Sequence, residues 1–532
     1  MALLNQTEAA RHRALQRHRV ASLRTGSSSL TWLPAVTDWI GLAAVLVTAT
    51  ALAPAVFVVQ TAITAGWSTF VTLVFRARVA ELLVNTVALI FFTLPACGVI
   101  AVALAWLVER SDVPGRRLLA WLAIAPLAIP AFVHSYAWIG AFPGMGGIWA
   151  GVFVATLAYF PFLYLPVAAT LQRLDPALED VAASMGLGPR QVFTRVVLPQ
   201  LRIPLCGGGL LIGIHLLAEY GLFAMMRFDT FTTAIVDQFE ASYNGPAAIM
   251  LALVLIAGCG MLLALEAFAR GDRRYARVGR GAPRLHTRIR LGRMAYPSLI
   301  GALFVVGLAL AVPVLTLGRW LWFGGIATWA DAELASTLLH TLQLASIGAA
   351  LTTLAAFPAA WISVRRTGMP ARLVEAASYF VGAIPGVIVA LALVAVTVHY
   401  AHPLYQTEPA LLLAYGIMFL PRAITGLRGS LAQVPKALEE VAGSLGRSPL
   451  RAVRDVTLRL AAPGVGSALA LVALGIANEL TATLMLAPNG TRTLATQFWA
   501  YSSEIDYVAA APYAVLMVLL SAPMTIMLCA RR

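Results

Sequence analysis

Uncharged runs long enough to cross a lipid bilayer constrain this chain more than any other feature. The longest runs from Leu83 to Val108 and holds 26 residues without a charge, whereas about 20 apolar helical residues cross a hydrocarbon core of roughly 30 Å. Inside lipid a helix satisfies its own backbone hydrogen bonds, so such runs fold as helices. With 60% hydrophobic and 12% charged residues over the whole length, the composition excludes a soluble domain. We therefore expect an all-α polytopic membrane protein.

The apolar windows repeat along the whole chain. About twelve transmembrane helices are expected, near residues 36–60, 83–108, 117–140, 147–170, 203–224, 246–268, 294–318, 337–363, 373–398, 409–430, 463–486 and 509–530. Two histidines in the loop HYAH, His399 and His402, are too few for a metal site, and no metal ligand set is firmly assigned.

The basic residues set the orientation of these spans. If the N-terminus is cytoplasmic, 33 of the 38 Lys and Arg residues fall in cytoplasmic segments and five on the other side, as the positive-inside rule requires. Both termini are then cytoplasmic, and residues 1–35 form a basic cytoplasmic tail and not a cleavable signal peptide. The net charge of +14 suits anionic lipid headgroups, so we expect a lipid membrane and no nucleic acid as partner.

A duplicated segment divides the chain into halves. ALEDVAASMGLGPR at 177–190 returns as ALEEVAGSLGRSPL at 437–450, with eight of fourteen residues identical, and Glu219 returns as Glu479 at the same spacing of 260. Such duplication marks two structural repeats around one pathway. We expect a first transmembrane domain over 36–268, a cytoplasmic Arg-rich linker over 269–293 and a second transmembrane domain over 294–532.

Each copy of the duplicated segment has one apolar helical face. Apolar residues stand at i, i+3, i+4 and i+7, and a glycine, Gly186 or Gly446, then interrupts the pattern where a chain reversal is easiest. A short helix, a turn and a second helix are expected. The alternative is an amphipathic helix lying on the bilayer surface, which the presence of two equivalent copies disfavours.

These segments resemble the cytoplasmic EAA loop of bacterial ABC importer permeases, a loop with a fixed pattern from Glu-Ala-Ala to Leu-Pro. Asp180, Val181, Ala182, Gly186, Val196, Leu198 and Pro199 match the pattern, and so do Glu440, Val441, Ala442, Gly446, Val456 and Leu458. Arg459 stands where the second copy should have its proline, so we expect the exit from the second loop to differ in angle. The resemblance implies two six-helix, MetI-like (type I) repeats, with coupling loops at 177–200 and 437–460.

The resemblance also implies a role and partners. The chain would be the permease subunit of a binding-protein-dependent importer in the bacterial inner membrane, served by a periplasmic substrate-binding protein. Two copies of an ABC ATPase subunit would bind ATP and Mg and dock on the loops, while this chain would be no enzyme and would hold no cofactor. Its one lysine, Lys436, lies outside any phosphate loop. The implied coupling residues are Glu179, Asp180, Val181, Ala182, Gly186, Leu198, Pro199, Glu439, Glu440, Val441, Ala442, Gly446 and Leu458.

Residues 218–239 and 477–499 resemble the matching segments of ferric iron importer permeases. Oxygen ligands suit this hard cation, so Glu219, Tyr220 and Glu479 are candidate residues of a substrate pathway, with Asp229 and Asp237 nearby. Two other roles for the glutamates stay open, namely pairing with Arg227 or Arg492, or capping the outer ends of their helices. Thiamine, phosphonate or polyamine importers share the scaffold and remain alternative substrate classes.

A proton-coupled secondary transporter is the alternative from another class, because twelve spans in two halves also fit that architecture. Such carriers place several ionisable residues at the middle of the membrane. Here the candidates are few, namely His215 and Glu219 in the fifth span and Glu479 in the eleventh. An ATP-driven importer is therefore favoured.

Overall fold

The computed structural model describes residues 33–240, 245–271, 288–329 and 332–530. Within these ranges the chain is helical apart from short connections, and the one strand-like pairing is a bridge between Ser111 and Ile289. The predicted N-terminal tail before residue 33 and most of the predicted linker, 272–287, lie outside the described residues.

Nine helices of the described residues are long and apolar enough to cross a membrane, and up to twelve spans result if each of three bent helix pairs counts as one. The predicted all-α class and the expected number of spans are confirmed. The nine helices are α2 (Leu33–Ala65), α4 (Ala77–Arg110), α7 (Gly147–Arg173), α14 (Gly245–Arg270), α15 (Ala295–Gly324), α16 (Ala332–Arg365), α19 (Glu408–Leu431), α22 (Arg459–Ala477) and α25 (Tyr507–Ala530).

Two predicted spans are bent by more than 90°. The span predicted at 117–140 consists of α5 (Arg116–Leu122), η1 (Ala125–Ala128) and α6 (Ala131–Ala141), bent by 95°, and the span at 373–398 consists of α17 (Met369–Ala383) and α18 (Gly386–Tyr400), bent by 96°. Both bends fall at an Ile-Pro pair, at Pro130 and at Pro385. Proline lacks an N–H and pushes the preceding residue out of the α region, so the helix ends there.

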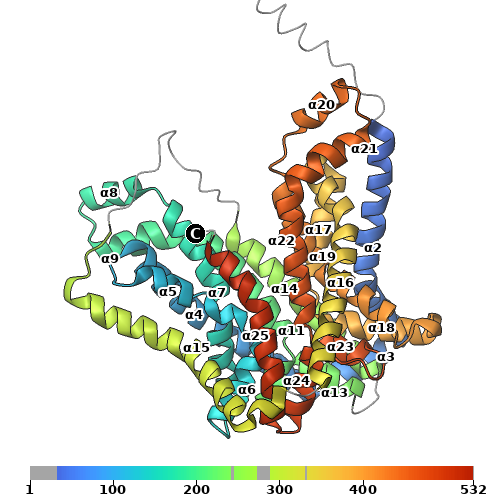
Figure 1. Cartoon of the computed structure of the whole chain (residues 1–532), viewed down its shortest axis with the longest axis horizontal. Helices are drawn as coiled ribbons and strands as arrows, with labels where there is room; N and C mark the ends of the chain where they lie inside the picture. The colour runs from blue at the N-terminus through green and yellow to red at the C-terminus, as the bar shows by residue number, and fades with distance from the viewer. Residues whose placement is uncertain (1–32, 241–244, 272–287, 330–331, 531–532) are drawn as a thin grey trace, which may run out of the picture.

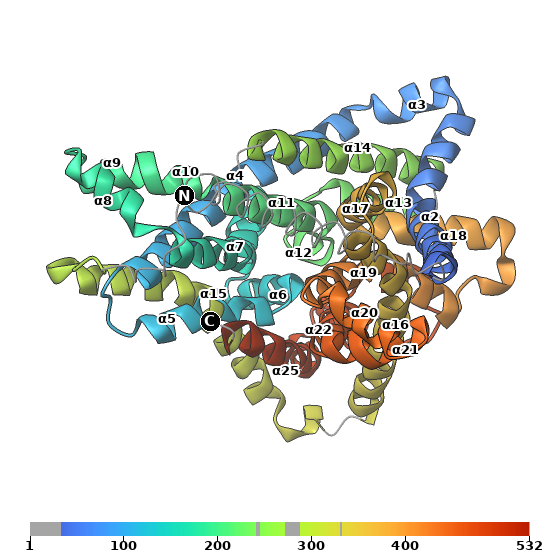
Figure 2. The same ribbon diagram turned by 90° about the horizontal axis from the view of Figure 1, so that it is seen from above.

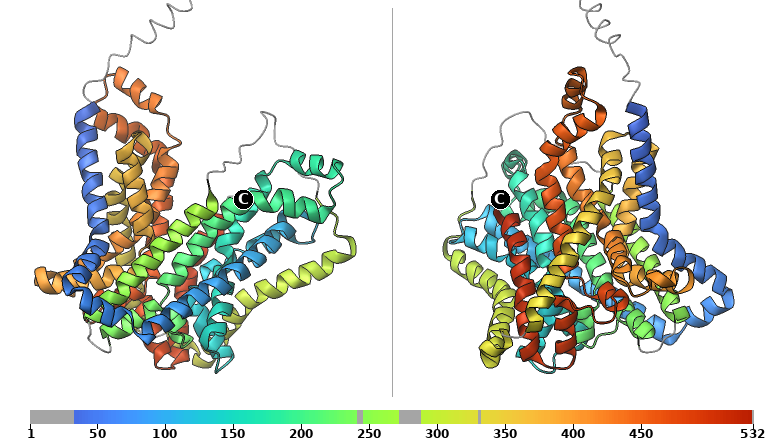
Figure 3. Two further views of the ribbon diagram at one scale, coloured as in Figure 1. Left: turned by 180° about the vertical axis from the view of Figure 1, so that it is seen from behind. Right: turned by 45° about the vertical axis from the view of Figure 1, so that its right-hand side comes forward.

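The duplicated loops lie at one end of the molecule. Helix α8 (Pro176–Ser184) and helix α20 (Lys436–Ser444) stand apart at the top of Figure 1, and both lie at the upper end of the molecule in Figure 3. Helices α13 (Phe231–Glu240) and α24 (Leu494–Ser503) lie at the opposite end, near the short α3 (Trp67–Val74). The longer helices run between these two ends.

Short helices complete each half. In the first half they are α9 (Pro189–Val192), the π-helix η2 (Phe193–Val197), α10 (Leu198–Gln200), α11 (Arg202–Ala218) and α12 (Gly221–Met225). In the second half they are η3 (Gly292–Met294), η4 (Ile326–Trp329), η5 (His402–Leu404), α21 (Pro449–Ala452), the π-helix η6 (Val453–Leu458) and α23 (Thr481–Leu486).

The first span of each half packs on the other half. Helix α2 contacts α16, α17 and α18, whereas α15 contacts α5, α6 and α7, and Figure 2 shows α2 among the helices of the second half and α15 beside α5. The buried side chains agree, because Ala51 and Val58 of α2 belong to a core with the second half, while Val306 of α15 belongs to the core of the first half. The two halves are therefore interlocked.

Close helix contacts depend on small residues. A Cβ atom added at Gly426 of α19 would lie 3.0 Å from the Cβ and 3.2 Å from the Cα of Ala468 on α22. A larger side chain there would have to push two backbones apart. Gly429, one turn later on α19, has no atom within 4 Å of such a Cβ, so it faces open space.

We expect Gly426→Leu to destabilise the protein by about 1 to 3 kcal/mol, the usual cost of overpacking, and to lower its thermal midpoint in detergent. Gly429→Leu makes the same chemical change on the same helix and should leave the midpoint unchanged. Size-exclusion chromatography after heating measures both. Equal midpoints for the two variants would contradict the close α19–α22 contact.

Candidate functional site

The first coupling helix, α8, begins and ends with clear local signals. The Asp175 carboxylate accepts a hydrogen bond from the Ala177 N–H at 3.0 Å, and Pro176 occupies the first helical position, where its missing N–H costs nothing. The helix ends at Ser184, and Gly186 follows in the turn with a φ of 86°, which suits glycine because it has no Cβ. The predicted helix and turn are present.

The second coupling helix, α20, repeats this form, with Gly446 at a φ of 81°. In both helices the alanine of the motif, Ala182 or Ala442, is buried, whereas the large apolar side chains point away from the protein. The exposed side chains are Leu178, Val181 and Met185 on α8 and Leu438, Val441 and Leu445 on α20. Exposed apolar patches of this kind mark surfaces that bind another protein.

The two loops leave in different directions, as the missing proline predicts. In the first half the segment Pro189–Gln200, which contains Leu198 and Pro199, is bent by 59° from α11. In the second half Leu458 and Arg459 lie inside one helix that runs from Val453 to Ala477. The bend is found where proline interrupts the backbone hydrogen bonds.

Two of the predicted coupling residues have partners inside the chain. Glu179 forms an ion pair with Arg110 at 3.0 Å, and Glu439 forms one with Arg365 at 2.5 Å. Their neighbours Asp180 and Glu440 are exposed. A docking role for Asp180 and Glu440 therefore stays a prediction, whereas the glutamates beside them point into the protein.

A cavity of about 510 Å³ lies between the halves, and it brings together the three predicted pathway residues, Glu219, Tyr220 and Glu479. They come from the breaks between α11 and α12 and between α22 and α23. The cavity is also lined by residues of α17, α18 and α19, among them Gly382, Gly386, Met418 and Arg422. Two carboxylates at equivalent positions therefore share one cavity.

Each glutamate caps the short helix that follows it. Glu219 accepts a hydrogen bond from the Leu222 N–H at 3.1 Å, and Glu479 accepts one from the Ala482 N–H at 3.0 Å. The glutamates thus cap the starts of α12 and α23, whereas capping was predicted for the outer ends of the helices that precede them, α11 and α22. Pairing of Glu479 with Arg492 is not supported, because Arg492 forms its ion pair with Glu333.

The halves differ around these glutamates in three side chains that the sequence analysis did not assign to the site. The Tyr159 hydroxyl donates a hydrogen bond to Glu219 at 2.6 Å, whereas Phe419 stands 260 residues later. At the same spacing of 260 residues, Arg422 is the counterpart of Phe162 and Gly475 is the counterpart of His215. A Cβ at Gly475 would lie 2.7 Å from an Arg422 guanidinium nitrogen, so the glycine makes room for the arginine.

Arg422 lies within the span predicted at 409–430, but the count of 33 cytoplasmic basic residues includes it, and the structure corrects this count. Arg422 lies within α19, its guanidinium faces the cavity, and it stacks on Phe419 at 5.0 Å. An arginine directly after Pro421 inside an apolar run was the available signal, because a charge within a span is functional by default.

The other acidic candidates lie outside this cavity. Asp229 forms an ion pair with Arg78 at 2.6 Å. Burial, and then the nearby Asp229 charge, raises the pKa of Asp237 above its ordinary value. Among the described residues no group of three His, Cys, Asp or Glu side chains could hold a metal ion.

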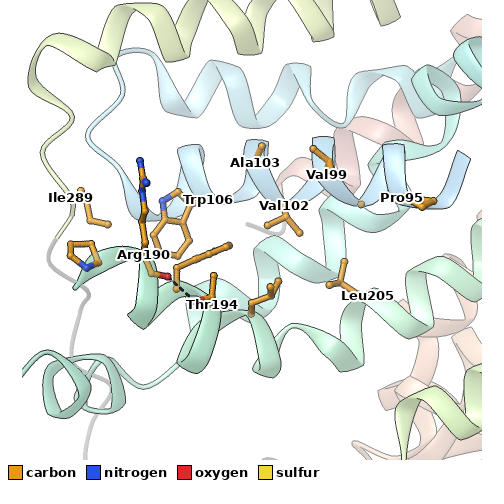
Figure 4. Close-up of a pocket in the computed structure, with 13 residues that line it drawn as sticks. Pro95, Val99, Val102, Ala103, Trp106, Arg190, Thr194, Leu205 and Ile289 are labelled. Carbon is orange, nitrogen blue, oxygen red and sulfur yellow. Dashed lines mark hydrogen bonds between the residues drawn. The ribbon is translucent and has the colours of Figure 1, made fainter. Parts of the chain in front are cut away.

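A wider hollow of about 840 Å³ lies between α4 and the segment Pro189–Leu205 of the first half. Figure 4 shows Trp106 of α4 beside the helix that carries Arg190 and Thr194. Its lining is apolar apart from these two residues and includes no carboxylate. The cavity between the halves is therefore the better candidate for a transport pathway.

Residues 62–276 and 348–528 match the model of a protein family described as the inner membrane component of binding-protein-dependent transport systems. The chain belongs to this family. The two matched segments fit the two MetI-like repeats, and each contains one coupling loop and one cavity glutamate. The boundaries predicted for the domains stay predictions.

The relatives of this permease include transport proteins named for two different substrates. The chain is 36% identical over 488 residues to the Fe(3+)-transport system permease protein FbpB 2 of Haemophilus influenzae, and the match covers 91% of this chain and 96% of the relative. It is 27% identical over 256 residues to the sulfate transport system permease protein CysT of Salmonella typhimurium, covering 44% of this chain and 92% of the relative. The first relative thus matches both halves.

Membership of this family makes the protein a multi-pass membrane permease. It is a transport subunit that works with an ATPase and with a substrate-binding protein, as the family's name and the family resemblance of its loops imply. An ATP-driven importer is favoured over the proton-coupled alternative.

The glycine turns of the coupling loops can be tested directly. Replacing Gly186 and Gly446 by Val forces a β-branched residue to a positive φ, at a cost of roughly 1 to 3 kcal/mol per site. This cost corresponds to a binding constant for the ATPase subunit that is about five- to 150-fold weaker at each loop. We therefore expect the purified permease to retain less ATPase subunit. The first copy should be the less tolerant, because it alone ends in Leu198-Pro199.

Gly188 offers a matched control in the same loop. Its φ of −69° is accessible to any residue, and no atom lies within 4 Å of a Cβ placed there. Gly188→Ala should therefore retain the ATPase. Full retention by the Gly186→Val and Gly446→Val double variant would disprove the role of the turns.

Proposed function

We propose that this permease moves ferric iron from the periplasm to the cytoplasm by ATP-driven alternating access. The observation that carries the proposal is the pair Glu219 and Glu479, which come from equivalent helix breaks and line one cavity between the halves. Carboxylate oxygens suit a hard trivalent cation. The long match to an iron transport permease supports the same substrate.

The partners of this transport cycle follow from the two coupling helices. Each exposes three large apolar side chains at the same end of the molecule, so two copies of an ABC ATPase subunit are proposed to dock there, one on each helix. ATP and Mg would be bound and ATP hydrolysed by those subunits, while this chain binds no cofactor. The coupling end then faces the cytoplasm of the bacterial inner membrane, and both termini are cytoplasmic.

The periplasmic partner would deliver iron at the opposite end. The helices α13 and α24 lie there and precede the last spans of the two halves, so they are the proposed surface for a periplasmic substrate-binding protein. Glu219 and Glu479 follow α11 and α22 at the ends that point away from the coupling helices.

Sulfate is a second candidate substrate because of one specific residue. Arg422 places a fixed positive charge in the cavity, and an arginine binds oxyanions well. The sulfate permease relatives, however, match less than half of this chain. Importers of thiamine, phosphonate and polyamine share the scaffold, but no observation in this structure favours these substrates.

The cavity glutamates provide the test. Glu219→Gln together with Glu479→Gln keeps the shape and the capping hydrogen bonds but removes two charges, so we expect iron uptake to fall about tenfold or more, equivalent to about 1.4 kcal/mol of lost stabilisation. Radiolabelled iron uptake into proteoliposomes, normalised to assembled complex, measures this.

Arg422→Gln separates the two candidate substrates in the same assay. If iron is the substrate, this variant should keep more iron uptake than the double glutamine variant. Sulfate uptake that depends on Arg422, with iron uptake absent, would replace the iron proposal. Lower assembly with unchanged normalised uptake would make the glutamates architectural caps alone.

A further inference from the structure

Both halves contain the same three-residue clamp at the coupling end. Each clamp consists of an arginine at the end of α4 or α16, a tryptophan one turn earlier on the same helix, and a glutamate on the coupling helix. The residues are Trp106, Arg110 and Glu179 in the first half and Trp361, Arg365 and Glu439 in the second.

The arginines are buried and held in place. The side chains of Arg110 and Arg365 are 4% and 8% exposed, and each guanidinium lies over the ring of its tryptophan, at 5.9 Å from Trp106 and 5.4 Å from Trp361. Stacking on an aromatic face fixes the direction of an arginine. Each guanidinium therefore points at its coupling helix before any ATPase binds.

The second clamp also holds the returning arm of its loop. The Thr457 hydroxyl of η6 donates a hydrogen bond to Glu439 at 2.7 Å, and Arg365 donates one to the Val434 carbonyl at 3.0 Å. Lys436 donates to the Arg365 carbonyl at 2.9 Å. The start of the loop, the coupling helix and the returning arm are thus all joined to the end of α16.

The first clamp reaches the same result with different residues. The residue equivalent to Thr457, 260 positions earlier, is Val197, which has no hydroxyl. Here the Trp106 ring instead packs edge to face on Phe193 of the returning helix, with the ring centroids 4.9 Å apart. Figure 4 shows Trp106 beside the ribbon of Arg190 and Thr194. The Ile289 N–H donates a hydrogen bond to the Arg110 carbonyl at 2.9 Å. Both halves therefore brace the loop against a span that is not its neighbour in sequence.

From this geometry we propose that Arg110 and Arg365 are positioning residues that make each coupling helix move as one rigid body with α4 or α16. A buried ion pair resists separation because breaking it leaves a charge without its partner inside the protein. A displacement of α8 or α20 is then passed to the span and not absorbed by bending of the loop.

The span leads directly to the transport cavity. Helix α16 packs along α19, which carries Arg422, and along α22, which Glu479 follows by two residues. In the first half α4 packs along α7, which carries Tyr159, the hydrogen-bond partner of Glu219. Each clamp therefore connects a coupling helix to one cavity glutamate through packed helices.

This inference rests on the proposed function only in assuming that an ATPase moves the coupling helices. The test uses the complete permease with its ATPase and binding protein in proteoliposomes, and compares the wild type with a Glu179→Gln and Glu439→Gln double variant. We expect the amount of bound ATPase to stay within twofold, while iron taken up per ATP hydrolysed falls at least fivefold. Glu179→Asp with Glu439→Asp keeps both charges and should restore at least half of the wild-type ratio.

A matched control lies in the second half. Glu375 pairs with Arg428 at 2.8 Å between α17 and α19 and touches no coupling helix, so Glu375→Gln should leave the ratio unchanged. An unchanged ratio in the double glutamine variant, or a loss of uptake that only follows a loss of bound ATPase, overturns the proposal.

A second measurement needs neither substrate nor ATPase. With the native cysteines replaced, spin labels at Ser184 of α8 and Ala103 of α4, both exposed, report the distance between coupling helix and span in the permease alone. We expect a narrow distance distribution in the wild type and a broader one in the Glu179→Gln variant. Equal widths in the wild type and the Glu179→Gln variant overturn the clamp. A broader distribution in the variant, together with no iron uptake by the wild type in the proteoliposome assay, retains the clamp and rejects iron as the substrate.

Discussion

The requirement that every backbone N–H and C=O be satisfied inside lipid governs this structure. It makes the described spans helical and permits breaks only where protein or water surrounds them. The breaks after α11 and α22 obey this rule, because they face a cavity and because a glutamate side chain accepts a hydrogen bond from an amide that the break leaves free. The same carboxylates that could meet a substrate therefore also hold the backbone in place.

The two halves share this frame but not its side chains. In the first half the glutamate accepts a hydrogen bond from Tyr159 and shares the cavity with His215, whose ring centroid lies 4.8 Å from that of Phe162. In the second half Phe162 is replaced by Arg422 and His215 by Gly475. His215 thus lines the cavity beside the glutamate of the first half, and Arg422 beside the glutamate of the second, so a substrate meets an asymmetric site within a pseudo-symmetric scaffold.

The sequence was sufficient for the features that depend on local pattern. The spans, the glycine turns of the coupling loops and the different exit at Arg459 follow from hydropathy, from positive φ and from a missing proline. The glutamates could be paired from their spacing of 260 residues. The bends at Pro130 and Pro385 were missed because hydropathy averages over a window and is insensitive to one interrupted hydrogen bond.

Contacts between distant segments could not be predicted from one sequence. Glu179 and Glu439 were assigned to docking because they lie in the loop motif, and only the structure places Arg110 and Arg365 beside them. Tyr159 and Arg422 reach the site because their helices pack against others, and a single sequence does not show which faces of distant helices meet. Arg422 was moreover counted with the cytoplasmic basic residues, although the predicted span 409–430 contains it.

The exchange of first spans has a consequence for how the protein is made. The core of the first half includes Ala302, Val306 and Ala309 of α15, which the ribosome adds only after all of the first half and the linker. That half must therefore wait in the membrane with one side unfilled until the seventh span is inserted. Likewise, α2 stays without its final neighbours until α16 follows. The fused chain keeps each waiting surface linked to the helices that complete it, which a pair of separate subunits would have to find by diffusion.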